Sequence, residues 1–234
     1  MEQLANIVRG RAERSDGEGV HMKNLFLASR FFPVAGRLPD LFGSLEGRRA
    51  VLIPTAGIVS RVKLPVGLHV KELARLGVTT QELEISSASH SEIAQAIRAA
   101  DIVFVSGGNT FFLLQELKRS GADRLIAEHV AQGKLYIGIS AGAVAAGPDI
   151  EYIKPMDDHR KGAGLRGDFA GLDLVALSVM PHCGDILFGK AAQRILARGD
   201  ARLDLRALTN RQAIAVRGAQ TSTVASRAHY RRQA

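Results

Sequence analysis

Residues 134–142 read Lys-Leu-Tyr-Ile-Gly-Ile-Ser-Ala-Gly, a short apolar run that leads directly into the pattern Gly-x-Ser-x-Gly. This pattern is typical of a sharp turn between a strand and a helix. Such a turn holds the hydroxyl of Ser140 clear of its own backbone, and the glycines on either side leave room for close approach. The helix that follows directs unpaired N–H groups toward developing negative charge. Ser140 is therefore the first candidate nucleophile for acyl transfer.

Strands and helices alternate around this turn. The predicted strands are near-continuous apolar runs at 23–29, 50–54, 78–85, 101–105, 135–138, 174–180, 205–209 and 213–216. The predicted helices lie at 66–76, 91–100, 110–119, 122–132 and 186–198. Continuous apolar strands that alternate with helices indicate a parallel sheet covered on both faces. The sequence thus predicts an α/β fold with a mostly parallel sheet.

Length and composition predict one folded domain. A chain of 234 residues, of which 46% are hydrophobic, suits a single α/β domain with a sizeable core. Residues 1–21 are polar and show no sustained periodicity, so we expect a flexible N-terminal extension before a domain at 22–234. The sequence shows neither a signal peptide nor an apolar run near the ~18 residues that span a bilayer. The single cysteine, Cys183, fits a reducing compartment, and we expect a cytoplasmic protein without membrane contact.

The net charge of +8 raises the possibility of nucleic-acid binding. The arginines are scattered, however, and the densest groups lie near the two ends of the chain: Arg9, Arg11 and Arg14, and Arg227, Arg231 and Arg232. Three tyrosines and no tryptophan make a base-stacking platform a poor interpretation. We therefore expect a solvated basic surface and no nucleic-acid partner.

Three turns that contain glycine follow predicted parallel strands, at 55–57, 106–110 and 138–140. Ligands of open α/β sheets bind beyond that edge, so the turns are expected to converge. The second turn lacks the spacing of a dinucleotide or P-loop motif. It is interpreted as half of an oxyanion hole, in which the N–H groups of Gly108 and Ala141 meet the substrate carbonyl oxygen. One such donor contributes roughly 3–4 kcal/mol to the transition state. The alternative is an ordinary turn between a strand and a helix.

His182 is the candidate base among seven histidines, because it follows an apolar strand and precedes a glycine. His159, in a loop after two aspartates, is the second choice. Three histidines in predicted helices are interpreted as surface residues: His69, His90 and His129. Cys183 is an alternative nucleophile, but it lacks a comparable turn and is interpreted as a pocket or core residue.

The pair Asp157 and Asp158 could in principle hold a metal ion, but no histidine or glutamate at ligand spacing supports such a site. Binding of a substrate amine or capping of a turn is the preferred interpretation.

From about Met22 to Val216 the chain resembles the peptidase E family of serine peptidases, which includes aspartyl dipeptidases and cyanophycinases. The resemblance rests on the motifs at 105–111, 136–143 and 181–182, in that order and at that spacing. Residues 151–158 resemble the branch described as type 1 glutamine amidotransferase-like.

The resemblance implies a three-layer α/β/α sandwich related to class I glutamine amidotransferases, with a flavodoxin-like arrangement. It also implies Ser140 as nucleophile, His182 as base, and the Gly108 and Ala141 amides as the oxyanion hole, with no metal and no cofactor. The function it implies is hydrolysis of short peptides by a serine peptidase of the dipeptidase kind. We expect a short peptide as substrate and a monomer or homodimer.

Two positions depart from the family pattern. Asn210 stands where an acidic third member of the triad is expected, so that Asp157, Asp158 or Asp185 is a possible substitute. The arginine that pairs with the substrate side chain in aspartyl dipeptidases aligns with Ala191, although Arg194 is nearby. The alternative function is therefore a binding protein of weak or lost activity, and an amidotransferase-like domain that uses cysteine is less favoured. The predicted substrate-binding residues are Asn109, Asp157, Asp158 and Arg194.

Overall fold

The computed structural model describes residues 22–60 and 65–227. Its main sheet has seven strands in the order β3-β2-β4-β5-β1-β8-β9. Their bounds are β1 (Asn24–Ala28), β2 (Arg49–Ile53), β3 (Thr79–Glu82), β4 (Ile102–Val105), β5 (Leu135–Ile139), β8 (Gln212–Arg217) and β9 (Gln220–Ala225). The five strands from β3 to β1 run parallel, whereas β8 and β9 pair antiparallel at one edge. The prediction of a mostly parallel sheet is confirmed.

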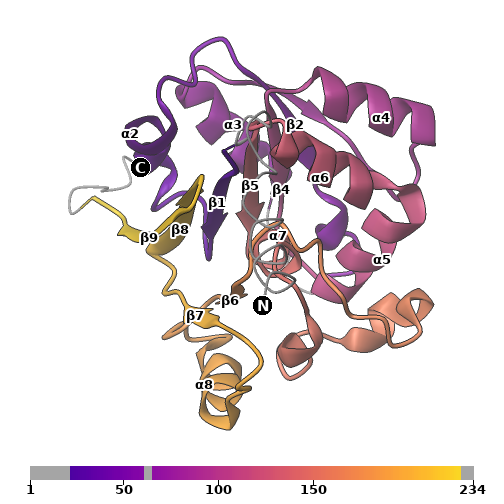
Figure 1. Ribbon diagram of the computed structural model, residues 1–234, viewed down its shortest axis with the longest axis vertical. Coiled ribbons are helices and arrows are strands. Elements are labelled where there is room, and N and C mark those ends of the chain that lie inside the picture. The colour runs from indigo at the N-terminus through magenta and orange to yellow at the C-terminus, as the bar shows by residue number, and fades with distance from the viewer. Residues whose placement is uncertain (1–21, 61–64, 228–234) are drawn as a thin grey trace, which may run out of the picture.

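Helices cover both faces of this sheet (Figure 1). One face packs against α4 (His90–Ala99), α5 (Thr110–Ser120), α6 (Ala122–Ala131) and α7 (Ala141–Ala145). The other packs against η1 (Ala35–Arg37), α2 (Leu38–Phe42) and α3 (Val66–Arg75). The strands supply both layers by alternation: in β1, Leu25 and Leu27 join the first apolar cluster, and Phe26 and Ala28 join the second. The structure is therefore a three-layer α/β/α sandwich, as predicted.

The register of the parallel strands places their carboxyl ends together. Ala28 of β1 lies opposite Ile139 of β5, and Val105 of β4 lies opposite Gly138. The segments that follow these strands therefore leave the sheet at one edge, as the position of the glycine turns predicts.

Local sequence signals fix several helix ends. Ser89 and Glu92 form a complete capping box at the start of α4, in which each side chain binds the backbone N–H of the other residue. The side chain of Asn109 accepts a hydrogen bond from the N–H of Phe112 and begins α5. Gly121 ends α5 in the left-handed conformation, with φ 77°.

A smaller unit lies beside the main sheet. The strands predicted at 174–180 and 205–209 are the shorter β6 (Ser178–Met180) and β7 (Leu205–Ala207), and they pair with each other in a separate parallel sheet. They lie together with α8 (Gly189–Arg198) below the main sheet in Figure 1. Helix α8 begins later than predicted because Asp185 accepts hydrogen bonds from the backbone N–H groups of Leu187 and Phe188 and holds a turn there.

Two further differences from the prediction concern strands. The run predicted at 78–85 forms only β3, because the chain turns at Glu84, whose carboxylate binds Ser86. Strand β9 was not predicted because it is polar and exposed, and its pairing with β8 determines its conformation.

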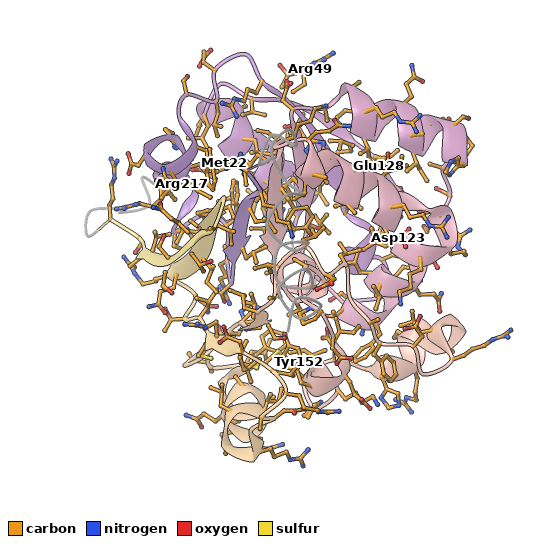
Figure 2. The ribbon with its side chains drawn as sticks, viewed as in Figure 1. Met22, Arg49, Asp123, Glu128, Tyr152 and Arg217 are labelled. Atoms are coloured by element: carbon orange, nitrogen blue, oxygen red, sulfur yellow. The ribbon has the colours of Figure 1, made fainter. Side chains whose placement is uncertain are left out.

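Four short 3-10 segments complete the described elements: η1, η2 (Thr55–Gly57), η3 (Glu151–Ile153) and η4 (His159–Leu165). Within residues 22–60 and 65–227, no helix has the length and apolar character needed to cross a bilayer. The predicted extension at 1–21 lies outside the described residues. Charged side chains are distributed around the molecule, as the labelled Arg49, Asp123, Glu128 and Arg217 illustrate (Figure 2).

Candidate active site

Ser140 lies at the sharp turn between β5 and α7. Its backbone has φ 50° and ψ −108°, a strained conformation for a residue other than glycine. The neighbouring glycines allow the turn to close: a Cβ on Gly138 would lie 2.6 Å from the carbonyl oxygen of Gly142, and a Cβ on Gly142 would collide with the carbonyl of Val105. The turn therefore holds the half-buried Ser140 side chain at the carboxyl edge of the sheet.

His182 lies beside this hydroxyl. The Ser140 Oγ and the His182 Nε2 are 2.8 Å apart, although 42 residues separate them in the chain. His182 follows β6 in the left-handed region, with φ 64°, and is 8% exposed. Burial lowers the pKa of His182, and the hydrogen bond with Asn210 opposes that effect in part. The ring is therefore neutral near pH 7, the state in which Nε2 can accept a proton.

Asn210 faces the other ring nitrogen. Its Oδ1 lies 2.8 Å from the His182 Nδ1, and its Nδ2 lies 2.5 Å from the Asp185 Oδ2. A carboxylate can only accept, so the Asn210 amide must direct its N–H₂ toward Asp185 and its oxygen toward His182. Nδ1 then carries the ring proton, and Nε2 is left with the lone pair that faces Ser140.

Ser29 and Arg30 complete this network, and no sequence motif points to either. Ser29 Oγ donates to the Asn210 Oδ1 at 2.9 Å and accepts from the backbone N–H of His182 at 2.9 Å. Arg30 pairs with Asp185 at 3.0 Å. Burial acts to raise the pKa of Asp185, but hydrogen bonds from Phe188, Leu187 and Asn210 and the charge of Arg30 lower it overall. Ser29 and Arg30 follow β1, so their place beside the glycine turns was the signal available in the sequence.

Two residues with candidate oxyanion-binding amides line the same cavity as Ser140. Gly108 and Ala141 both line it, and their N–H groups make no hydrogen bond to any of the described residues. Gly108 adopts φ 150°, and a Cβ there would collide with the carbonyl of Ala56. Glycine is therefore required where this loop passes closest to η2.

The cavity above Ser140 measures about 190 Å³. It is bounded by the segment after β1, by α3, by the glycine turn after β4, by α7 and by the segment around η3. His182 and Phe188 line it from the smaller unit, and their rings lie 5.1 Å apart. The hydroxyl, the imidazole and the two free amides thus share one enclosed space, in which an acyl group could be attacked.

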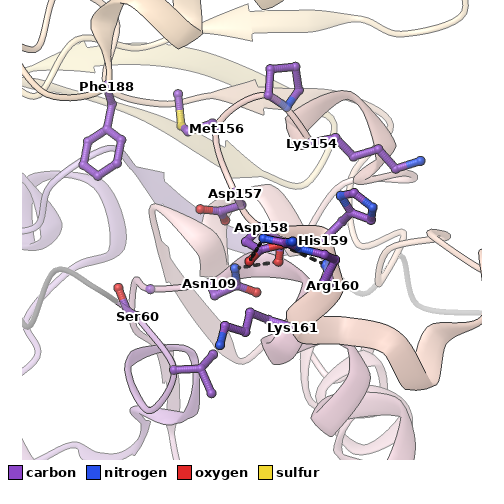
Figure 3. Close-up of a pocket in the computed structure, with 13 residues that line it drawn as sticks. Ser60, Asn109, Lys154, Met156, Asp157, Asp158, His159, Arg160, Lys161 and Phe188 are labelled. Atoms are coloured by element: carbon purple, nitrogen blue, oxygen red, sulfur yellow. Dashed lines mark hydrogen bonds and ion pairs between the residues drawn. The ribbon is translucent and has the colours of Figure 1, made fainter.

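A second, wider cavity of about 580 Å³ adjoins the first, and Asn109, Asp157 and Asp158 line it (Figure 3). Asp157 lines both cavities; its Oδ2 accepts from the backbone N–H and the hydroxyl of Thr110, at 2.8 and 2.5 Å. Burial raises the pKa of Asp157. Asn109 donates to the carbonyl of Asp158, whose carboxylate pairs with Arg160.

Neither the Ser140 nor the His182 side chain is hydrogen-bonded to Asp157, Asp158 or Arg194. Arg194 is exposed on α8 and lines neither cavity, because the smaller unit places that face of the helix away from both. Asp157 and Asp158 make no hydrogen bond to His182, so Asp185 is the carboxylate of the three that joins the network.

Two histidines differ from the sequence-based prediction. His69 and His129 are 3% and 2% exposed and are not surface residues, because the apolar faces of α3 and α6 carry them inward. His69 lines the cavity with Ser140, whereas His129 bonds to the carbonyl of Leu135. His90 is exposed, as predicted, and His159 packs against Phe111 in the wider cavity.

The Cys183 side chain is a partly buried, protonated thiol. The Cys183 sulfur donates to the carbonyl of Met180, and burial raises the pKa of the thiol, so it is protonated near pH 7. Among residues 22–60 and 65–227, no group of three histidine, cysteine, aspartate or glutamate side chains is arranged to hold a metal ion.

Comparison with known proteins places this site in a family. The model of peptidase family S51 matches residues 25–224. An uncharacterized peptidase of Listeria monocytogenes is 42% identical over 202 residues, which cover 86% of this chain and 98% of that protein. Peptidase E of Salmonella typhi is 36% identical over 146 residues, 62% of this chain and 60% of that one.

Solved structures agree with these matches. A crystal structure of a candidate peptidase E from Listeria monocytogenes EGD-e superimposes with a TM-score of 0.83 at 41% identity, and the match covers 88% of this chain and all of that one. A peptidase from an acI-B1 actinobacterium, at 21% identity and a TM-score of 0.67, shares the fold over 88% of this chain. The chain belongs to peptidase family S51 and is a peptidase.

Proposed function

We propose that this peptidase is of the serine type and hydrolyses short peptides. The observation that carries the proposal is the 2.8 Å contact between the Ser140 Oγ and a buried, neutral His182 Nε2. Because Nε2 carries the lone pair, it can take the hydroxyl proton as Oγ attacks a peptide carbonyl carbon. The Gly108 and Ala141 amides are positioned to donate to the oxyanion that forms.

Two steps complete the reaction. The tetrahedral intermediate collapses when the C–N bond breaks, and His182 gives its proton to the departing amine. A water molecule then attacks the ester on Ser140; His182 takes the proton of that water and returns one to Oγ. The acid product leaves, and the enzyme is regenerated with no other reactant.

The Asn210–Asp185 pair is proposed to orient His182 and to stabilise its charged form. Asn210 holds the Nδ1–H tautomer, which is the form the base requires. The negative charge that favours the imidazolium resides on Asp185, one residue farther from the ring than in a serine–histidine–aspartate triad. Arg30 offsets part of that charge, so stabilisation of the imidazolium is weaker than in a triad with a direct carboxylate.

Asp157 is proposed to bind the amino end of the peptide. Its Oδ2 accepts two hydrogen bonds from Thr110. Figure 3 shows the carboxylate pointing away from Lys154 and His159, toward the side of the cavity where Phe188 and Ser60 lie. A half-buried carboxylate at the cavity rim attracts the α-ammonium group of a short peptide. Such a contact favours cleavage close to a free amino end. The side chain of Asn109 donates a hydrogen bond to the carbonyl oxygen of Asp158 and so fixes the loop beside Asp157.

A dipeptide library tests the proposal. Wild-type protein is expected to release amino acids from some members. Ser140→Ala is expected to lower kcat/KM on them by at least ~10⁴, the loss typical of removing a serine nucleophile. Cys183→Ala is the matched control and is expected to retain most activity. Equal turnover by wild type and Ser140→Ala would overturn the serine mechanism.

A binding protein with little activity is the second candidate, and the neutral Asn210 favours it. A fluorophosphonate probe separates the two functions, because it labels only a serine that its base activates. Stoichiometric labelling of wild type, absent in Ser140→Ala, supports the peptidase. Folded wild-type protein that takes up no label supports the binding protein. The free thiol of Cys183 is consistent with a reducing compartment, and we propose the cytoplasm as the site of action.

A further inference from the structure

The wall of the 190 Å³ cavity is mainly apolar and aromatic. Apolar side chains from several segments line it, among them Phe31, Phe32, Leu68, Val144, Met156 and Phe188. The ring of Phe32 stacks on that of His69, with centroids 5.5 Å apart, and Phe31 meets both rings edge-on. A wall of this kind binds ligand groups by removing apolar surface from water.

His69 contributes an uncharged aromatic ring to this wall. The side chain is 3% exposed, and its buried Nδ1 has no hydrogen-bond partner among the residues that the structure describes. It packs against three phenylalanine rings: Phe31, Phe32 and Phe104. Burial lowers the pKa of His69 to about 4, so the imidazole is neutral at pH 7. His69 therefore extends the aromatic surface and offers no positive charge to an acidic ligand.

The charged groups at the cavity also disfavour an acidic side chain. Arg30 is already paired with Asp185, and His182 is occupied by Ser140 and Asn210. Asp157 adds an acidic group, which would repel a second carboxylate. Among the described residues that line this cavity, no cation is free to neutralise an aspartyl or glutamyl side chain.

We propose that this cavity is the pocket for the side chain next to the cleaved bond, and that it selects an uncharged apolar or aromatic residue such as phenylalanine or leucine. This inference rests on the proposed peptidase function and specifies its substrate class. The size agrees, because an apolar cavity of about 150 Å³ holds a benzene molecule. A cavity of 190 Å³ therefore accommodates one phenyl or isobutyl group.

Binding to Ser140→Ala protein tests the pocket without turnover. Isothermal titration with Phe-Ala, Leu-Ala, Asp-Ala and Lys-Ala compares apolar, acidic and basic side chains on one backbone. Phe-Ala and Leu-Ala are expected to bind at least tenfold more tightly than Asp-Ala and Lys-Ala. Equal or tighter binding of Asp-Ala or Lys-Ala overturns the proposal, and so does a failure of all four to bind.

A substitution in the wall tests the location. Leu68 lines the cavity and is 44% exposed, so Leu68→Arg adds a cation at the rim without burying it. In the Ser140→Ala background it is expected to reduce the preference for Phe-Ala over Asp-Ala at least tenfold. Leu196→Arg is the matched control, because Leu196 is 36% exposed on α8 and lines neither cavity. An equal preference for Phe-Ala over Asp-Ala in Leu68→Arg and Leu196→Arg would show that the side chain does not bind in this cavity.

Turnover by the Ser140 protein separates this inference from the proposed function. Cleavage of peptides together with tightest binding of Asp-Ala would retain the serine peptidase and reject the apolar pocket. Selective binding of Phe-Ala without cleavage of any peptide would retain the pocket and reject the peptidase mechanism.

Discussion

Asn210 shows how one side chain depends on its neighbour for its role. Its amide can present either oxygen or nitrogen to His182, and only the oxygen supports the Nδ1–H tautomer. The carboxylate of Asp185, 2.5 Å from Nδ2, selects that orientation. We therefore propose Asp185 as a positioning residue that acts through Asn210.

Replacement of Asp185 tests this dependence. In Asp185→Asn the new amide can donate as well as accept, so Asn210 is free to turn its nitrogen toward His182. We expect kcat to fall by about tenfold or more, because part of the protein holds the wrong tautomer. KM is expected to change little, since Asp185 does not line either cavity. A KM increase with unchanged kcat would contradict the positioning role.

Exchange of the two groups tests the electrostatics. The double variant Asn210→Asp/Asp185→Asn moves the carboxylate next to the ring and keeps a donor behind it. An adjacent negative charge favours the imidazolium, so the pKa of His182 should rise by about one unit or more. The acid limb of the kcat/KM profile then moves to higher pH, because the base is protonated at higher pH. In wild type, where burial lowers this pKa, the limb is expected below the ordinary value of 6.5. Profiles that coincide would rule out electrostatic coupling.

The turn between β4 and α5 requires a glycine, Gly108. The reason is a tertiary contact, and not the pattern of helices and strands. Gly108 has φ 150°, and its Cα faces the carbonyl of Ala56. Gly108 lines the cavity that contains Ser140. The same loop ends at Asn109, which caps α5. One short loop therefore starts a helix and positions a candidate oxyanion donor.

Gly108→Ala tests that element. A methyl group would collide with η2, and φ 150° is unfavourable for alanine, so we expect a loss of about 2 kcal/mol or more in the free energy of unfolding. Catalysis should fall as well, because the loop must shift to relieve the collision. Gly36→Ala is the matched control: its added Cβ meets nothing within 4 Å and its φ is not positive. Urea denaturation measures both variants, and equal stability would show that the close approach is not required.

Two buried neutral histidines affect the stability of the whole molecule. Burial lowers the pKa of both His69 and His129 to about 4, compared with an ordinary value of 6.5. Between these values the unfolded chain binds protons that the folded protein does not, so stability rises with pH there and is lost as the solution is acidified. Each histidine should therefore lower the free energy of unfolding by about 2 kcal/mol when the pH falls from 7 to 4.5.

His69→Phe is expected to remove about half of this dependence on pH and to preserve the aromatic packing around the ring. The free energy of unfolding from urea titrations at pH 7 and 4.5 measures the effect. A variant as sensitive to acid as wild type would show that His69 is not held neutral in the folded state.

The sequence by itself determined the layers and the position of the candidate nucleophile. Continuous apolar strands such as 101–105 and 135–139 are buried on both faces in any fold that contains them, so their pattern reports a parallel sheet directly. Gly-x-Ser-x-Gly encodes a turn through local backbone sterics, and Ser140 could therefore be placed on a rim from nine residues. The position of His182 could be predicted in the same way, because this residue follows an apolar strand.

The tertiary structure alone decided which side chains meet. The sequence does not record that Ser29, which follows the first strand, joins Asn210, nor that Asp185 sets the direction of the Asn210 amide. His69 lies in a segment with an ordinary amphipathic helix pattern. Only the packing of α3 against the sheet buries its side chain in the cavity wall. Local patterns arise from a few neighbouring residues, whereas hydrogen-bond direction, burial and pocket shape arise from contacts between segments far apart in the chain.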